Sequence, residues 1–276
     1  MRGPRGDGRG GHEGEGAARA RRLSEARFTA TARAYSSSPV AERRDENEAL
    51  LRLAAPAPAD RALDVACGPG ALLAALAPFV RYVAGVDLTA AMLEQAQRRL
   101  RDLSAAAPAG GVALVRGAAE RLPFRDGAFS LTVTTYALHH FGEPRLVVRE
   151  MVRVVGSGGR VLIGDLVGAD DDGARALQNE IERLRDPSHM EMQSTRGIEG
   201  LLASEGLTVT GRAEGATRRE LSEWLRLAHT PPDLAALVRD RLLESLPDDR
   251  AGMNVSLDGD TLRFVHRWGI VAARKP

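Results

Sequence analysis

The chain alternates between short apolar runs and segments in which apolar residues have the spacing of amphipathic helices. The short apolar runs predict strands near 61–66, 81–87, 112–116, 129–135, 160–166, 207–213 and 261–273. The helical spacing predicts helices near 40–54, 70–77, 90–103, 145–155, 173–185 and 194–205. Such alternation is typical of an α/β fold, in which right-handed crossovers build a parallel sheet. We therefore expect a Rossmann-like, mostly parallel sheet of seven strands with helices on both faces.

Two segments lie outside this alternation. Residues 1–22 contain seven glycines, interspersed charges and almost no large apolar side chain, so they are expected to be disordered. Residues 23–276 are expected to form one domain. Within it, residues 218–246 have helical periodicity and interrupt the link to the last strand. This insertion is expected to cover the open end of the sheet and shape a pocket, and packing away from the pocket is the alternative.

Composition narrows the class of protein. With 276 residues and 43% apolar content, the chain is long enough to bury a full core. Its net charge of +1 lacks the basic excess of a nucleic-acid-binding protein, and 37 arginines against one lysine indicate nucleotide-composition bias. The single cysteine, Cys67, excludes an intrachain disulfide and a cysteine-cluster metal site. No apolar run is long enough to cross a membrane, so we expect a cytoplasmic protein without a membrane partner. From the net charge and the single cysteine, we also expect no nucleic-acid partner and no metal.

A turn of small residues follows the first predicted strand. Gly68 and Gly70 lack a Cβ, so the backbone there can turn sharply and approach a ligand. Asp87 ends the next strand, where its carboxylate can accept hydrogen bonds from ribose hydroxyls. Leu73 stands in place of the third small residue of a dinucleotide-binding loop, and the only lysine, Lys275, lies too far away for a Walker A loop. The turn therefore predicts a nucleoside site of another kind.

Further motifs occur in a fixed order along the chain. The string D-x-x-C-G-P-G, from Asp64 to Gly70, is followed by Gly85-Val86-Asp87 and then by segments 117–124, 129–135, 137–141, 150–155 and 160–166. Together they resemble the class I S-adenosylmethionine-dependent methyltransferases, in the branch of quinone-biosynthesis C-methyltransferases and natural-product glycoside O-methyltransferases. The resemblance covers about residues 27–275. It implies S-adenosylmethionine as the cofactor, held by Asp64, Ala66, Cys67, Gly68, Gly70, Asp87, Leu88, Met92, Ala119, Glu120 and Thr134.

Two positions depart from the family pattern. Ala118 stands where members often carry an aspartate that contacts the adenine amino group, so this contact is expected from the backbone or from Glu120. Ala66 replaces the first glycine of G-x-G-x-G, and alanine is still small. Met92 is expected to pack either on the adenine or in the core.

Candidate bases follow the fourth and fifth predicted strands. His139 and His140 come just after the fourth strand and Asp165 lies near the end of the fifth, where open α/β sheets place ligands. A histidine can take a proton near neutral pH, and a carboxylate can orient the histidine or serve as the base itself. The matching groups are the proposed catalytic residues of the glycoside O-methyltransferases that the chain resembles. We expect His140 to act with Asp165, and His139 is the second choice.

The acceptor is less well defined. Tyr35 and His189 are candidates to cover or contact it, as is Trp224 in the helical insertion. We expect methyl transfer to an oxygen or carbon of a small-molecule metabolite. Exocyclic-amine methylation of nucleic acids usually shows Asn/Asp-Pro-Pro-aromatic after the fourth strand, and residues 134–137 do not match it. Protein methylation stays an alternative, as does a cofactor-binding fold that performs another reaction. The oligomeric state is not determined by the sequence.

Overall fold

The structure is a computed structural model that describes residues 10–36, 44–101 and 108–276. Its strands are β1 (Arg61–Val65), β2 (Tyr82–Asp87), β3 (Val112–Arg116), β4 (Phe129–Thr135), β5 (Val155–Val167), β6 (Thr208–Glu220), β7 (Ser256–Asp258) and β8 (Thr261–Arg274). Its α-helices are α1 (Gly10–Ser36), α2 (Arg44–Ala54), α3 (Ala71–Leu76), α4 (Ala90–Arg101), α5 (Pro144–Val154), α6 (Asp172–Arg185), α7 (Thr195–Ser204), α8 (Leu221–Ala228) and α9 (Pro232–Glu244). Two short 3₁₀ helices are η2 (Ala77–Phe79) and η3 (Leu138–His140).

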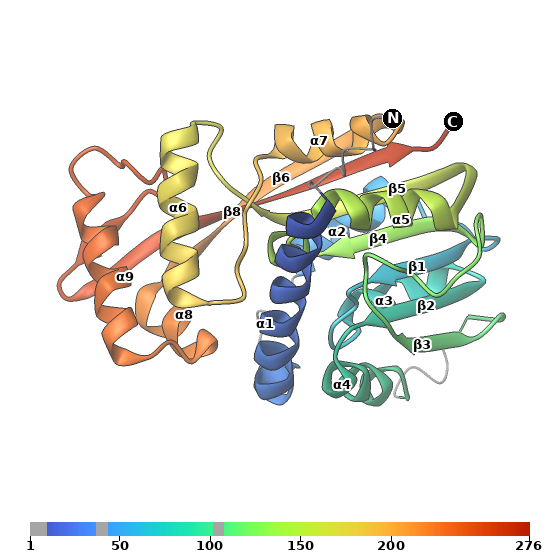
Figure 1. The fold of residues 1–276 in the computed structure, drawn as a ribbon, viewed down its shortest axis with the longest axis horizontal. Helices are drawn as coiled ribbons and strands as arrows, with labels where there is room; N and C mark the ends of the chain where they lie inside the picture. Colours follow the sequence, from blue (N-terminus) through green and yellow to red (C-terminus); the bar gives the residue numbers. More distant parts are fainter. Residues whose placement is uncertain (1–9, 37–43, 102–107) are drawn as a thin grey trace, which may run out of the picture.

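The central sheet has the strand order β3-β2-β1-β4-β5-β8-β6, and the short β7 pairs with β8 (Figure 1). The strands from β1 to β5 are parallel to their neighbours, whereas β8 is antiparallel to both β5 and β6. The prediction of a Rossmann-like, mostly parallel sheet is therefore confirmed. Residues 156–159, between the expected helix near 145–155 and the expected strand near 160–166, fall within β5, where the pairing with β4 jumps from Val155 to Arg160.

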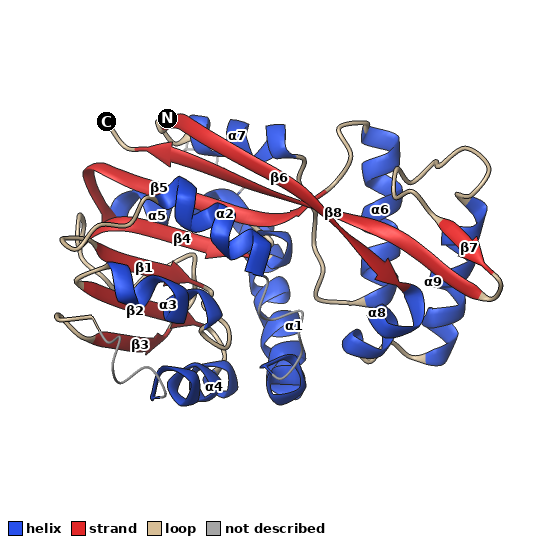
Figure 2. Cartoon of the chain, turned by 180° about the vertical axis from the view of Figure 1, so that it is seen from behind, coloured by secondary structure: helices blue, strands red, loops and turns tan. Residues whose placement is uncertain are grey.

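Apolar side chains cover both faces of the sheet. On one face, Met151 of α5 and Ile198 of α7 pack against strand residues such as Val161. On the other face, Leu50 of α2 and Leu73 of α3 form a second core (Figure 2). Because both faces are buried, the central strands contain nearly continuous apolar runs, which is why they are easily recognised in the sequence.

The N-terminal helix α1 differs from the prediction. It includes residues 10–22, which were expected to be disordered, whereas residues 1–9 lie outside the described part. Ala17 and Ala20 are buried, and a Cβ added to Gly142 would lie 3.0 Å from the Ala17 Cα and 3.1 Å from the Ala20 Cβ. Disorder is expected for residues 1–22 because they contain almost no large apolar side chain. In the structure, small residues on α1 and the glycine at position 142 allow this helix to pack closely against the rest of the protein.

The helical insertion lies away from the open end of the sheet. Strands β6 and β8 continue past the main sheet as a long antiparallel pair, and α6, α8 and α9 surround that extension (Figures 1 and 2). A third core forms there, in which the Trp224 and Phe264 rings meet edge to face with centroids 4.8 Å apart. The expectation that the insertion shapes the pocket is therefore wrong, and Trp224 is a core residue of this second lobe.

Candidate active site

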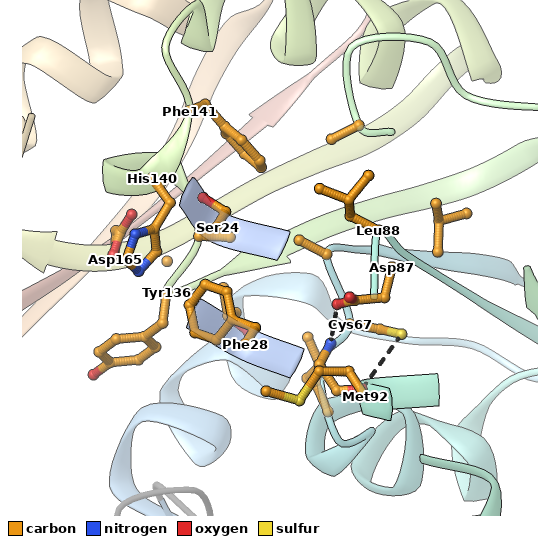
Figure 3. A pocket seen from close by; sticks show the side chains of 18 of the residues that line it. Ser24, Phe28, Cys67, Asp87, Leu88, Met92, Tyr136, His140, Phe141 and Asp165 are labelled. Atoms are coloured by element: carbon orange, nitrogen blue, oxygen red, sulfur yellow. Dashed lines mark hydrogen bonds between the residues drawn. The ribbon is translucent and has the colours of Figure 1, made fainter. Parts of the chain in front are cut away.

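A cavity lies at the carboxyl ends of β1, β2, β4 and β5, beneath α1. Its empty volume, including space open to solvent, is about 1270 Å³. In Figure 3, Cys67, Asp87, Leu88 and Met92 lie on one side of it, and Tyr136, His140 and Asp165 lie on the other. Ser24 and Phe28 of α1 lie between the two groups. The cavity therefore has two chemically distinct ends that share one space.

The two glycines of the β1 turn have different roles. Gly68 has φ +51°, and a Cβ at this position would meet no atom within 4 Å, so its open side faces the cavity. Gly70 has φ +78° and is the N-cap residue that precedes α3, where a Cβ would lie 2.9 Å from the Ala96 Cβ of α4. Gly70 therefore allows helix packing and does not line the cavity. Ala66, with φ +58°, adopts the left-handed conformation in which glycine has no steric penalty.

Replacing Gly70 with alanine is expected to lower the free energy of unfolding by about 2–4 kcal/mol, because left-handed strain adds to the overlap with Ala96. Urea unfolding measures the change. Gly200→Ala is the matched control: Gly200 lies in α7, nothing approaches its would-be Cβ within 4 Å, and alanine there should stabilise the protein by about 0.4–1 kcal/mol. Equal stability of Gly70→Ala and the wild type would contradict the packing role.

Leu73, which argued against a dinucleotide site, has a specific place in the core. A Cβ on Gly85 of β2 would lie 2.6 Å from the Leu73 Cδ1. The missing side chain on β2 thus makes room for a large side chain on α3.

Most of the residues predicted to hold the cofactor line the cavity: Ala66, Cys67, Gly68, Asp87, Leu88, Met92, Ala119 and Glu120. Three do not: Asp64, Gly70 and Thr134. The Thr134 hydroxyl donates to the Val65 carbonyl at 2.8 Å, which ties β4 to β1. Asp64 is only 1% exposed, and burial, followed by the nearby Asp87 carboxylate, raises its pKa well above the ordinary value. Its neutral form is therefore favoured beneath the turn.

Several polar groups in the cavity have the chemistry to bind a nucleoside. The Asp87 carboxylate accepts the Gly68 N–H at 2.8 Å and the Thr89 N–H at 2.9 Å. Among the described residues, Glu120 Oε1 and the Ser24 hydroxyl are buried without a hydrogen-bond partner. The Arg21 guanidinium of α1 lies 3.7 Å from that Glu120 oxygen. A carboxylate at the end of β2, an open glycine and unsatisfied polar atoms together fit a ligand that carries a ribose and an amino-bearing base.

The buried aspartate of β5 pairs with His139. The Asp165 Oδ1 and the His139 Nδ1 are 2.5 Å apart, and the His139 backbone N–H donates to Oδ2 at 3.0 Å. Burial opposes both charges, yet their attraction wins: the pKa of His139 is raised and the pKa of Asp165 is lowered. The expected partnership of His140 with Asp165 is therefore wrong. Because the Leu166 N–H also donates to Asp165, this carboxylate is an anchor rather than a free base.

Of the two adjacent histidines, His140 lines the cavity and His139 does not. Its Nδ1 lies 3.0 Å from the Ser188 carbonyl oxygen, and the Phe28 ring meets it edge to face with centroids 5.0 Å apart. Burial, followed by the nearby His139 charge, lowers the pKa of His140 to about 3. A carbonyl oxygen only accepts, so the neutral ring carries its proton on Nδ1. Nε2 is then the basic nitrogen available to the cavity.

His189, a candidate to cover or contact the acceptor, lies behind this site and does not line the cavity. It is only 2% exposed, and its Nε2 lies 2.7 Å from the Asn179 Oδ1 of α6. Its ring centroid lies 5.5 Å from that of His139. Burial lowers the pKa of His189 to about 4. The residue is therefore a neutral support for the histidine turn.

These neutral histidines make the fold sensitive to mild acid. An unfolded chain protonates histidine near pH 6.5, whereas His189 titrates at about 4 in the folded chain, so its contribution to stability is lost as the pH falls through this window. We expect His189→Gln to remove about 2 kcal/mol of the difference in unfolding free energy between pH 7 and pH 5. Urea unfolding at both pH values tests this, with the exposed His229→Asn as control. An unchanged pH dependence would contradict it.

Sequence reasoning missed several lining residues. Glu46 and Asn47 come from α2, and Trp268 comes from β8. Tyr136, just after β4, has φ +52° and its hydroxyl donates to Glu46 Oε1 at 3.1 Å. A bulky residue in this conformation often marks a functional position. The other lid candidate, Tyr35, lies in α1, but its side chain is outside the described part.

Two further findings concern the described residues as a whole. They contain no group of three or more His, Cys, Asp or Glu residues placed to hold a metal ion. Within the same ranges, every helix is too short or too polar to span a membrane.

Comparisons with known proteins show which proteins this chain is similar to. A family model described as a methyltransferase domain matches residues 63–163. An uncharacterized methyltransferase of Bacillus subtilis, YcgJ, is 30% identical over 213 residues, which are 76% of this chain and 81% of that protein. The crystal structure of YcgJ has a TM-score of 0.78 with 26% identity, over 84% of this chain and 99% of that chain.

Two other similarities are more limited. A demethylmenaquinone methyltransferase of Clavibacter sepedonicus is 36% identical over 115 residues, which are 42% of this chain and 44% of that protein. The [4+2]-cyclase SpnF has a TM-score of 0.57 with 18% identity, over 83% of this chain and 79% of that chain, so the likeness concerns the fold alone.

Proposed function

The chain belongs to the class I S-adenosylmethionine-dependent methyltransferases, and we propose that it transfers a methyl group to an oxygen or carbon of a small molecule. The observation that carries this proposal is the single cavity that joins the nucleoside-binding end at Asp87 to the end lined by His140 and Tyr136. Donor and acceptor held in one enclosed space react as an intramolecular pair, which can supply much of the rate enhancement.

S-adenosylmethionine supplies an activated methyl group when it is bound. We assign Asp87 to the ribose hydroxyls, while Gly68 leaves room for the ligand beside the turn. Leu88 and Met92 offer apolar surface to the adenine, and Glu120 offers an acceptor for its amino group. Gly70 and Thr134 would act from behind the cavity lining: Gly70 allows α3 to pack against α4, and Thr134 ties β4 to β1.

In this proposal, His140 takes the proton from an oxygen acceptor. Its low pKa keeps Nε2 free of a proton at neutral pH. The acceptor oxygen becomes strongly acidic as it gains a methyl group, so a weakly basic imidazole is sufficient. The Asp165–His139 pair supports this role because the positive charge on His139 favours the neutral form of His140, whose ring centroid lies 4.2 Å away. General-base assistance of this kind contributes about 10²–10⁴ in rate.

The side chains around the acceptor end favour an apolar molecule without negative charge. Phe28, Leu50 and Trp268 supply apolar surface, while Glu46 and Tyr136 form a hydrogen-bonded polar pair in the same lining. A carboxylate in this position repels phosphate and carboxylate groups and attracts hydroxyl or amino groups.

Glu46→Gln is expected to reduce the preference for benzylammonium over benzyl phosphate by about fivefold, because the carboxylate contributes about 1 kcal/mol to it. Binding is followed by Trp268 fluorescence in a Trp224→Phe background, which removes the other tryptophan, with S-adenosylhomocysteine filling the donor end. Glu48→Gln is the matched control, since Glu48 is exposed on the same helix outside the cavity lining. An equal effect of both substitutions would reject the assignment.

The proposed function is tested by incubating the protein with methyl-labelled S-adenosylmethionine and a small-molecule extract. Label in a low-molecular-weight product supports it. A parallel incubation supplies a protein extract, and label in protein there, without label in a small molecule, would support protein methylation instead. Binding of the cofactor without any transfer would favour a non-methylating reaction. This outcome is included because SpnF, which has a similar fold, is a cyclase.

A further inference from the structure

His140 is held from behind by the loop that follows α6. Its Nδ1 lies 3.0 Å from the Ser188 carbonyl oxygen and 3.2 Å from the Ser188 hydroxyl oxygen. That hydroxyl donates to Asp186 Oδ1 at 2.6 Å, and the Ser188 backbone N–H donates to the same oxygen at 2.9 Å. With its hydrogen directed to Asp186, the hydroxyl can only accept from His140. Both Ser188 oxygens therefore require the proton on Nδ1.

The Asp186 carboxylate is in turn held by α1. Arg27 Nε donates to Asp186 Oδ2 at 3.0 Å, across 159 positions of the sequence. Both side chains are shielded, with 16% of Arg27 and 8% of Asp186 exposed. The next residue of the helix, Phe28, meets the His140 ring at a right angle. Two consecutive residues of α1 thus act on His140, one by direct contact and one through Asp186 and Ser188.

We propose that Arg27 is a positioning residue for His140, which it orients through Asp186 and Ser188 so that the basic Nε2 faces the acceptor. Docking of α1 therefore does more than cover the cavity: it also sets the tautomer and orientation of the ring below it. The importance of this tautomer for catalysis rests on the proposed function, but the tautomer itself does not.

The charges around His140 determine what the loss of Arg27 should do. His139 and His189 face the ring from its own turn and from the loop after α6, and Asp186 is the acid that opposes them. Arg27 counters the charge of Asp186. Without Arg27, the carboxylate acts on His140 with less opposition, so the pKa of His140 should rise. The loop should also lose its fixed geometry, which would allow both neutral tautomers.

The test uses the full chain with ¹⁵N-labelled histidine, and His140→Gln assigns the ring signals. At pH 7 the wild type should show a protonated Nδ1 and a bare Nε2 on His140. Arg27→Gln should shift both nitrogen signals toward the averaged values of mixed tautomers, and Arg27→Lys should restore the wild-type pattern because it keeps the charge. Arg22→Gln, an exposed change on the same helix, should have no effect.

If Arg27→Gln does not fold, Asp186→Ala tests the link from the other side, because it removes the acceptor for Arg27 and for both Ser188 donors. Unchanged His140 signals in a folded variant of either kind would overturn the inference. Turnover separates this inference from the proposed function. If His140→Gln remains fully active while Arg27→Gln alters the tautomer, the positioning role stands and the catalytic role of His140 fails.

Discussion

Replacing His140 with alanine is expected to lower the rate of methyl transfer by about 10²–10⁴, while the affinity for S-adenosylmethionine changes by no more than about twofold. The side chain lines the acceptor end of the cavity, on the opposite side from Asp87 and Met92 (Figure 3). Its removal takes away the basic nitrogen without touching the side chains that we assign to the nucleoside. The rate is measured as label transferred to the low-molecular-weight fraction, and the affinity by calorimetry.

Two variants separate proton transfer from packing. His140→Gln keeps a side chain that can donate to the Ser188 carbonyl but cannot take a proton at neutral pH, so it should lose as much activity as His140→Ala. His229→Asn removes an exposed histidine at the end of α8 and should be neutral. Wild-type turnover of His140→Gln would show that the ring only fills space. A parallel loss of turnover and cofactor affinity would point to a role in cofactor binding.

The central sheet could be predicted because the residue types within each of its parallel strands are enough to identify that strand. Most residues of the strands from β1 to β5 are apolar or threonine, apart from the glycine-rich turn within β5, and both faces of the sheet are covered by helices. The extension of β6 beyond residue 213 could not be predicted in this way. In that part of β6, partly buried and exposed residues alternate, and none is fully buried. It is a strand because its backbone pairs with residues 263–269 of β8. Pairing between such distant segments leaves no hydrophobic pattern in either one alone.

The donor end of the site could be predicted from residue types at strand ends. Gly68 and Asp87 meet there because β1 and β2 are parallel neighbours, so their carboxyl ends share one edge of the sheet. The sequence could not indicate that Gly70 serves packing, because Ala96 approaches it from a different helix. The sequence also could not indicate the α2 and β8 residues that line the acceptor end, since both elements are distant in the chain from Tyr136 and His140.

The histidine assignment shows why adjacent residues are hard to separate by sequence. His139 and His140 lie in the 3₁₀ turn η3, where successive side chains point about 120° apart. One ring therefore faces the cavity when the other faces Asp165. The pattern Ala-Leu-His-His fixes neither direction, so the sequence could not indicate that His139 pairs with Asp165 while His140 lines the cavity.

Replacing Asp87 with asparagine is expected to weaken cofactor binding by roughly 10²-fold or more, because hydrogen bonds to a charged group contribute about 1.5–3 kcal/mol each. The carboxylate ends β2 at the donor end of the cavity and can accept from both ribose hydroxyls. Calorimetry with S-adenosylhomocysteine measures the loss. The substitution also affects the turn, since an amide can accept from only one of its two present donors, the Gly68 and Thr89 N–H groups, without opposing the other.

A cofactor analogue without ribose hydroxyls separates these two effects. If Asp87 binds the hydroxyls, the wild type should bind 2′,3′-dideoxy-S-adenosylhomocysteine much more weakly than the natural ligand, and Asp87→Asn should bind both about equally. If the variant instead loses the same factor for both ligands, the carboxylate acts only by holding the Gly68 turn. In that case the glycine turn, and not the acid at the end of β2, would carry most of the affinity at the donor end.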